Sequence, residues 1–190
     1  MTLKTPHDIL DPIKHTSPRL AGMLKRNRLD TLEIVSAYLF AIGNGGMLEL
    51  DYVRPDGQSF NPRPARVSAI LMKDMHIKNR ELIIAAILAC ADEDSLRSKA
   101  AAEFGEELVN MALEAQLACC NTLESTLQPT IIAAALWLDR ARHFHLAEAV
   151  PKNAAAITEF FYKYFSAVGS PMAPLIGRYM PPLKNSQDNL

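Results

Sequence analysis

The sequence predicts a single all-α domain, and two observations carry that prediction. Apolar residues recur at helical spacing along most of the chain, whereas the alternating pattern of a half-buried strand is nearly absent. Hydrophobic residues make up 49% of the 190 residues, which is enough to bury one core. We therefore expect residues 1–180 to form one helical domain and the polar residues 181–190 to form a disordered tail.

The first predicted helices precede a long loop. Ser17, which stands before a proline, indicates the start of the first helix. Asp30, with Glu33 three residues later, has the spacing of an N-terminal cap and predicts the second helix, which a glycine-rich stretch ends. Residues 43–64 then predict a loop that is a candidate lid or binding loop, with 49–53 as its one candidate strand.

The next helical pattern contains the centre of the domain. Periodicity resumes at Pro64 and returns over residues 79–91. The second stretch is apolar on every face, because all seven residues from Leu82 to Leu88 are aliphatic. A helix of this kind needs neighbours on all sides, so we expect its C-terminal end to face an interior or a cleft.

Helices fill the remainder of the chain. Ser95 is the expected cap of a helix that ends before Gly105, and Glu106 begins another. A long helix is predicted over residues 131–149, and an aromatic-rich helix after Pro151. A last short element precedes the tail.

Charge and cysteine content narrow the classes of function. Twenty basic and twenty-one acidic residues leave a formal charge of −1, so no global field gathers nucleic acid or anionic lipid. An odd count of three cysteines argues against a disulfide framework. The N-terminus has no apolar targeting segment, and no apolar run reaches the length of a membrane span. We expect a cytoplasmic protein that binds neither nucleic acid nor membrane.

Four strings stand in a specific order along the chain. They read Arg63-Pro-Ala-Arg-Val-Ser68, Ala85-Ala-Ile-Leu-Ala-Cys-Ala-Asp-Glu-Asp94, Phe104-Gly-Glu-Glu-Leu108 and Trp137-Leu-Asp-Arg-Ala-Arg-His143. In this order and at these separations they resemble the HD-type hydrolase domain of the RelA/SpoT family, which removes pyrophosphate from (p)ppGpp. The resemblance covers residues 32–169 and implies an HD-domain helical bundle.

The resemblance also shows what is changed. The family binds a divalent cation, typically manganese, at the positions that here hold Arg63, Ala89, Cys90 and Asp139. An alanine methyl has no lone pair, and an arginine guanidinium offers only hydrogen-bond donors. Cys90 and Asp139 alone fall short of the three or four protein ligands of a catalytic site. We therefore expect no metal and no other cofactor.

Several candidate site residues persist at the positions the resemblance marks. Glu93 and Asp94 match the pair that assists hydrolysis in the family, so they are vestigial catalytic residues or, alternatively, a solvated turn after the central helix. Arg63 either holds a phosphate or pairs with Asp139 in the vacated site. The candidates for binding an anionic ligand are Arg63, Arg66 and Arg140.

Two further features predict packing. Cys119 and Cys120 are adjacent in an apolar helix, lack the spacing of a redox motif and have no cation nearby in the sequence. Trp137 lies between two leucines and is expected in the core.

Three functions stay open. The favoured one is a pseudoenzyme that binds a guanosine polyphosphate, another phosphorylated small molecule or a protein partner. The alternative is an active (p)ppGpp-type phosphohydrolase with a replacement metal on Cys90, Asp139 and His143. Against this, histidines near the end of a helix, such as His143 and His145, commonly interact with the helix dipole instead. The third is a structural module that forms a homo-oligomer or partner interface through residues 43–64 and the aromatic helix.

Overall fold

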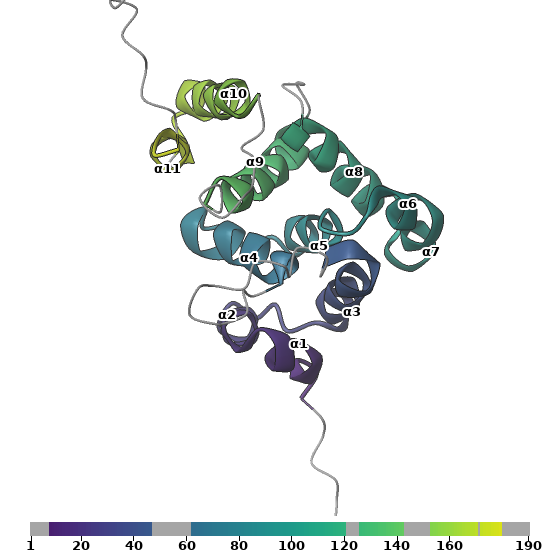
Figure 1. The fold of residues 1–190 in the computed structure, drawn as a ribbon. Coiled ribbons are helices and arrows are strands. Elements are labelled where there is room, and N and C mark those ends of the chain that lie inside the picture. Colours follow the sequence, from purple (N-terminus) through teal and green to yellow (C-terminus); the bar gives the residue numbers. More distant parts are fainter. Residues whose placement is uncertain (1–7, 47–61, 121–125, 143–152, 171, 180–190) are drawn as a thin grey trace, which may run out of the picture.

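The fold is helical throughout the part of the chain that can be described. The computed structural model describes residues 8–46, 62–120, 126–142, 153–170 and 172–179, and every regular element in these ranges is a helix. The predicted all-α class is confirmed. Figure 1 shows α5 (Arg80–Leu88) surrounded by α3, α4, α8 and α9, with α10 and α11 at one end.

Three helices, not two, precede the long loop. They are α1 (Asp11–Thr16), α2 (Pro18–Arg26) and α3 (Leu32–Ala41), which continues into the π-helical turn η1 (Ile42–Gly46). The sequence analysis did not predict α1, because a helix of six residues with one buried side chain, Ile13, is too short to show helical periodicity. The predicted loop and its candidate strand, 49–53, fall within residues 47–61, outside the described ranges.

The predicted caps are correct in one case and displaced in two. Ser17 caps α2 by accepting a hydrogen bond from the amide of Leu20. Thr31, and not Asp30, caps α3, because its extended backbone (φ −108°, ψ 156°) puts the hydroxyl beside the amide nitrogens of the first turn. Asp92, and not Ser95, begins the helical run after α5, with its carboxylate 2.7 Å from the Ser95 amide nitrogen.

The prediction of a buried central helix is confirmed. Asn79 caps α5 through a 2.8 Å hydrogen bond from the Leu82 amide to its side chain. Every residue from Leu82 to Leu88 is at most 8% exposed. Before it, α4 (Arg63–Ala69) passes into the π-helical turn η3 (Ile70–Asp74). The C-terminal end of α5 therefore lies in the interior, as expected.

Short helical segments then connect α5 to the long helix α8. They are α6 (Glu93–Ser95), η4 (Leu96–Ala100) and α7 (Ala101–Phe104), and α8 spans Glu106–Cys120. The predicted break falls at Gly105, whose φ of +83° is disfavoured for any residue with a side chain. The chain turns there, and α7 and α8 enclose a hollow on the outer side of α5.

The last helices complete the core. They are α9 (Leu127–Arg142), α10 (Ala154–Ala167) and α11 (Met172–Gly177). Trp137 on α9 is fully buried as predicted, and its indole nitrogen donates a 3.1 Å hydrogen bond to Thr158 on α10. The predicted extension of α9 to residue 149 and the predicted tail, residues 181–190, lie outside the described residues.

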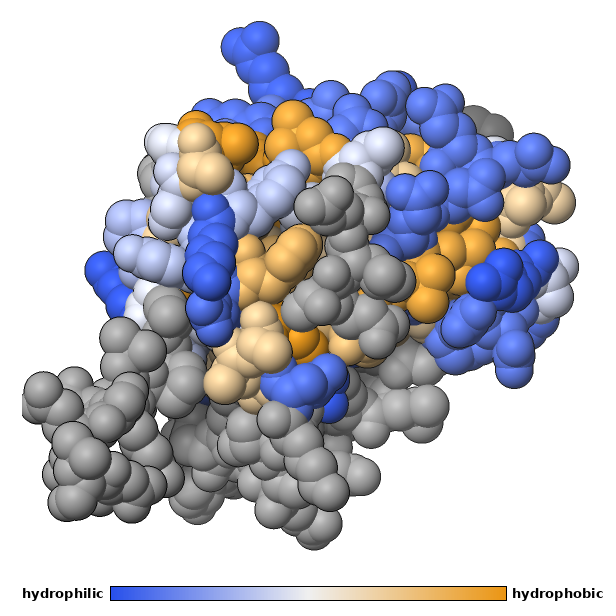
Figure 2. Space-filling view, turned by 90° about the horizontal axis from the view of Figure 1, so that it is seen from above, coloured by the Kyte–Doolittle hydropathy of each residue, from blue (hydrophilic) through white to orange (hydrophobic). Residues whose placement is uncertain are grey.

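Most large apolar side chains are buried, but some reach the surface. Leu117, Leu127 and Val168 are about half exposed or more (48%, 56% and 61%). Figure 2 shows apolar surface between hydrophilic residues on the face seen from above. Among the described helices, none is both long enough and apolar enough to cross a bilayer.

Candidate functional site

The most distinctive polar contact in the core joins Arg66 on α4 to Asp139 on α9. Arg66 Nε lies 2.7 Å from Asp139 Oδ1, and Arg66 Nη2 lies 2.9 Å from Oδ2. The side chains are only 14% and 3% exposed, so the pair is largely shielded from water. Both carboxylate oxygens thus accept a charge-assisted hydrogen bond from one planar guanidinium.

This pair gives Asp139 an arginine partner that the sequence analysis did not name. Arg63 was the arginine considered as a partner of Asp139, and the ion pair described above is made by Arg66, one helical turn further along α4. Arg66 was a candidate for binding an anionic ligand, yet its guanidinium is bonded to Asp139. Of the arginine candidates, Arg140 is exposed and Arg63 is partly exposed.

The residues that follow α5 are packed closely. Ala89 is 2% exposed and Cys90 is 4% exposed. The Cys90 thiol donates a 3.3 Å hydrogen bond to the carbonyl of Ala86. Gln116 on α8 donates to the carbonyls of Ala89 and Ala91, at 3.0 and 2.7 Å. These bonds satisfy acceptors that a helix C-terminus leaves open, and they close the end of α5 with a side chain of α8.

The side chains around Asp139 and Cys90 are poorly placed to bind a metal ion. Within the described ranges, no three His, Cys, Asp or Glu side chains gather as a metal site would require. Asp139 offers its oxygens to a cationic guanidinium, which would repel a metal ion. His143 and His145 lie outside the described residues.

Glu93 and Asp94 lie at the surface. The Glu93 carboxylate forms an ion pair with Arg97, with 2.8 Å between Oε1 and Nη2, and both side chains are more than half exposed. The backbone carbonyl of Asp94 accepts a hydrogen bond from Ser98. A solvated turn is compatible with these contacts, and the role of a vestigial catalytic pair stays a prediction.

The cysteine pair differs from its prediction. Cys119 is buried as expected, but Cys120, at the end of α8, is exposed. The pKa of Cys120 is lowered to about 6, chiefly by a hydrogen bond from the Cys119 side chain; burial opposes this shift, and the positive charges of Arg140 and Arg63 contribute to it. The expectation that no cation lies near these thiols is therefore wrong, because the arginines come from α9 and α4.

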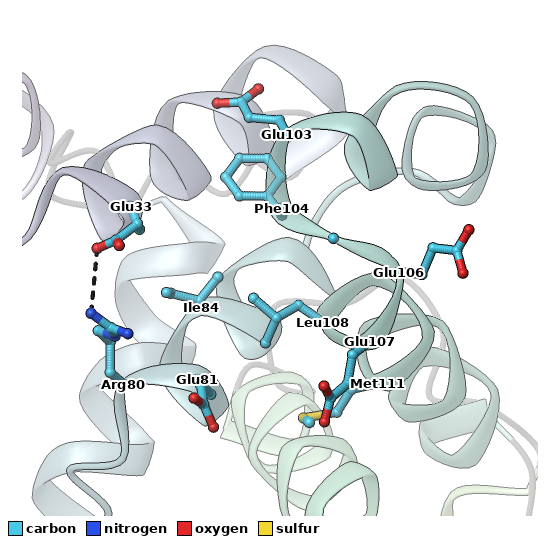
Figure 3. A pocket seen from close by; sticks show the side chains of 11 residues that line it. Glu33, Arg80, Glu81, Ile84, Glu103, Phe104, Glu106, Glu107, Leu108 and Met111 are labelled. Atoms are coloured by element: carbon cyan, nitrogen blue, oxygen red, sulfur yellow. Dashed lines mark ion pairs between the residues drawn. The ribbon is translucent and has the colours of Figure 1, made fainter.

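A hollow on the other side of α5 was not predicted. Figure 3 shows it between α3, the first turns of α5, α7 and the start of α8. Its volume is about 450 Å³. It is lined by Glu33, Arg80, Glu81, Ile84, Glu103, Phe104, Gly105, Glu106, Glu107, Leu108 and Met111. We call this hollow the acidic groove. Its lining comes from several separate segments, so no local sequence pattern reveals it.

The acidic groove has an apolar floor and a charged rim. Ile84 and Met111, 3% and 8% exposed, belong to the floor, together with Phe104 and Leu108, which are partly buried. The rim carries five glutamates and one arginine, Arg80, which forms a 3.7 Å surface ion pair with Glu33.

Comparison with protein-family models, with curated proteins and with solved structures finds no match to this chain. The class of this protein is therefore given by its fold and its two sites: it is an all-α protein with a buried arginine–aspartate pair and an acidic groove.

Proposed function

We propose that this chain is a non-catalytic member of the HD-type scaffold that its sequence resembles, with an arginine–aspartate pair in place of the lost metal. The observation that carries the proposal is the bidentate bond between Arg66 and Asp139. In the resembled family, the carboxylate at the position of Asp139 is a metal ligand. Here both of its oxygens are engaged by a side chain whose positive charge is permanent.

The surroundings of the pair support the same proposal. A metal ion would need to displace a guanidinium that is mostly shielded from water, and its other ligand positions are Ala89, whose methyl cannot coordinate, and Cys90. The Cys90 thiol is buried and donates to a backbone carbonyl. The alternative, an active phosphohydrolase with a replacement metal on Cys90, Asp139 and His143, would have to break these contacts.

As a binding protein, the chain would use Arg140 and Arg63, two of the three arginine candidates. Arg140 is exposed and Arg63 is partly exposed, and both act electrostatically on the same pair of thiols. Two arginines so placed could receive a phosphorylated ligand such as a guanosine polyphosphate. None of the three cysteines, all within the described residues, forms a disulfide, which supports a cytoplasmic location.

The test measures metal content and hydrolysis on the full chain purified without chelators. We expect substoichiometric manganese and zinc by elemental analysis, and no hydrolysis of guanosine tetraphosphate after manganese is added. Asp139→Asn is the control variant. Stoichiometric metal together with turnover that Asp139→Asn abolishes would overturn the proposal in favour of the phosphohydrolase.

Ligand binding is tested separately by equilibrium dialysis with guanosine tetraphosphate. Arg140→Gln should weaken binding, whereas Arg97→Gln, which removes an exposed arginine of the Glu93 ion pair, should not. Equal effects of the two variants would show that any binding is a non-specific response to surface charge.

A further inference from the structure

We infer that the acidic groove is a docking site for a basic amphipathic segment of another protein, which inserts an apolar side chain between flanking lysines or arginines. This inference does not depend on the non-catalytic function proposed above. It concerns the end of α5 that lies away from Ala89 and Cys90 (Figure 3).

The floor of the groove is built to receive an apolar group. Ile84 on α5 and Met111 on α8 are buried side chains of the core cluster, so their positions are held by the core. Phe104 makes an edge-to-face contact with Phe40 on α3, with 5.6 Å between the ring centroids. The volume of about 450 Å³ lies in the range of pockets that bury a ligand.

The mouth of the groove stays open at Gly105. A Cβ added at this residue would meet no atom within 4 Å, so the chain leaves space where α7 turns into α8. The glycine also permits the turn itself, because its φ is +83°. Gly105 thus lines the groove without a side chain of its own.

The negative charge of the rim favours a positively charged occupant. Five glutamates and one arginine give the lining a formal charge of −4, whereas the whole chain carries −1, so all other residues together carry +3. The negative charge of the molecule is thus concentrated here. An acidic segment, a nucleic acid or a phosphorylated ligand would be repelled, whereas lysine and arginine are attracted.

The arrangement favours a peptide over a metal ion. The rim carboxylates stand around an apolar floor and do not converge into a group that could hold a cation, within the part of the chain that the structure describes. Figure 3 shows Glu103 and Glu106 pointing away from each other. Lysine and arginine have apolar stems that can lie along such a floor while their charges reach the rim. An amphipathic helix in a groove combines both contacts.

The probe is a fluorescein-labelled helical peptide of about 15 residues with leucines on one face and lysines beside them. Binding to the full chain is measured by fluorescence anisotropy. We expect a Kd below about 100 μM at low salt, weakened by added salt as screened ion pairs require. Two control peptides, one with glutamate for lysine and one with serine for leucine, should each bind at least about tenfold more weakly.

A matched pair of variants locates the site. Glu107→Lys reverses a charge on the rim, and Glu114→Lys reverses an exposed charge on the same helix outside the groove. We expect Glu107→Lys to raise the Kd about fivefold or more and Glu114→Lys to raise it less than about twofold. Circular dichroism confirms that both variants are folded.

Several results would overturn the inference. The first is that the basic peptide shows no saturable binding. The second is that the serine-substituted peptide binds as tightly as the leucine peptide, which would indicate charge attraction alone. The third is that Glu107→Lys and Glu114→Lys change the Kd equally. Self-association of the chain that Glu107→Lys abolishes would show that the occupant is a second copy and not another protein.

Discussion

Replacing Arg66 should destabilise the fold, because the ion pair with Asp139 is buried. In Arg66→Met the aliphatic part of the side chain is kept and the guanidinium is removed. The Asp139 carboxylate, 3% exposed and bonded to Arg66 at 2.7 and 2.9 Å, would then lose both of these donors. A buried charge that loses its partner is costly.

The size of the effect follows from the burial of the two side chains. Breaking a buried ion pair by removing one partner costs about 3–5 kcal/mol. Arg66 is 14% exposed, so water can partly replace it and the lower end, about 3 kcal/mol, is expected. For a chain of this length, that corresponds to a fall in Tm of about 6–12 °C.

The assay is urea denaturation followed by circular dichroism, for Arg66→Met, Asp139→Leu and the double variant. Replacing a whole buried pair with apolar residues is often close to neutral, so the double variant should lie within about 1 kcal/mol of the natural chain. The two substitutions should therefore couple by at least about 2 kcal/mol. A cost below about 1 kcal/mol for Arg66→Met would refute the reasoning, since it would mean that Asp139 is reached by water.

Three further outcomes are expected. Alkylation of Cys120 by iodoacetamide should be half-maximal near pH 6 and slow as the pH falls below that value, because protonation removes the thiolate, and Cys119→Ala should move the midpoint to higher pH; a midpoint near 8.5, that of an ordinary thiol, would contradict the lowered pKa. Glu93→Ala should change the free energy of unfolding by less than about 1 kcal/mol, since its ion pair is exposed, and a larger loss in urea denaturation would show that it is more than a solvated turn. Thr158→Val should cost about 1–3 kcal/mol by leaving the indole nitrogen of Trp137 without its acceptor, measured by the fluorescence of this single tryptophan, and a neutral result would mean that the bond adds nothing.

The parts of the fold that sequence predicted correctly are those with local causes. The aliphatic run from Leu82 to Leu88 predicted a central helix because burial on every face is visible in composition alone. Gly105 predicted a break because a positive φ is a property of one residue. Cap positions at Thr31 and Asp92 were missed by one and three residues, since several neighbouring side chains had suitable chemistry and backbone geometry selected one.

The features that sequence could not predict depend on distant contacts. Arg66 and Asp139 are 73 residues apart, and their contact depends on how α4 packs against α9. The acidic groove arises where α7 and α8 turn beside α5, and each of its glutamates reads as an ordinary surface residue. The low pKa of Cys120 has the same origin, since Arg140 and Arg63 reach it from other helices.

The most direct test of the proposal that a metal site has been lost is to restore that site. Arg63→His, Ala89→His and Cys90→Asp reinstate the ligands of the resembled family, and Arg66→Ala releases Asp139 from its ion pair. Manganese binding to this fourfold variant and to the natural chain is compared by isothermal titration calorimetry. We expect one manganese ion per folded variant and none for the natural chain. A folded variant that binds no manganese, or a natural chain that binds it stoichiometrically, would contradict the account.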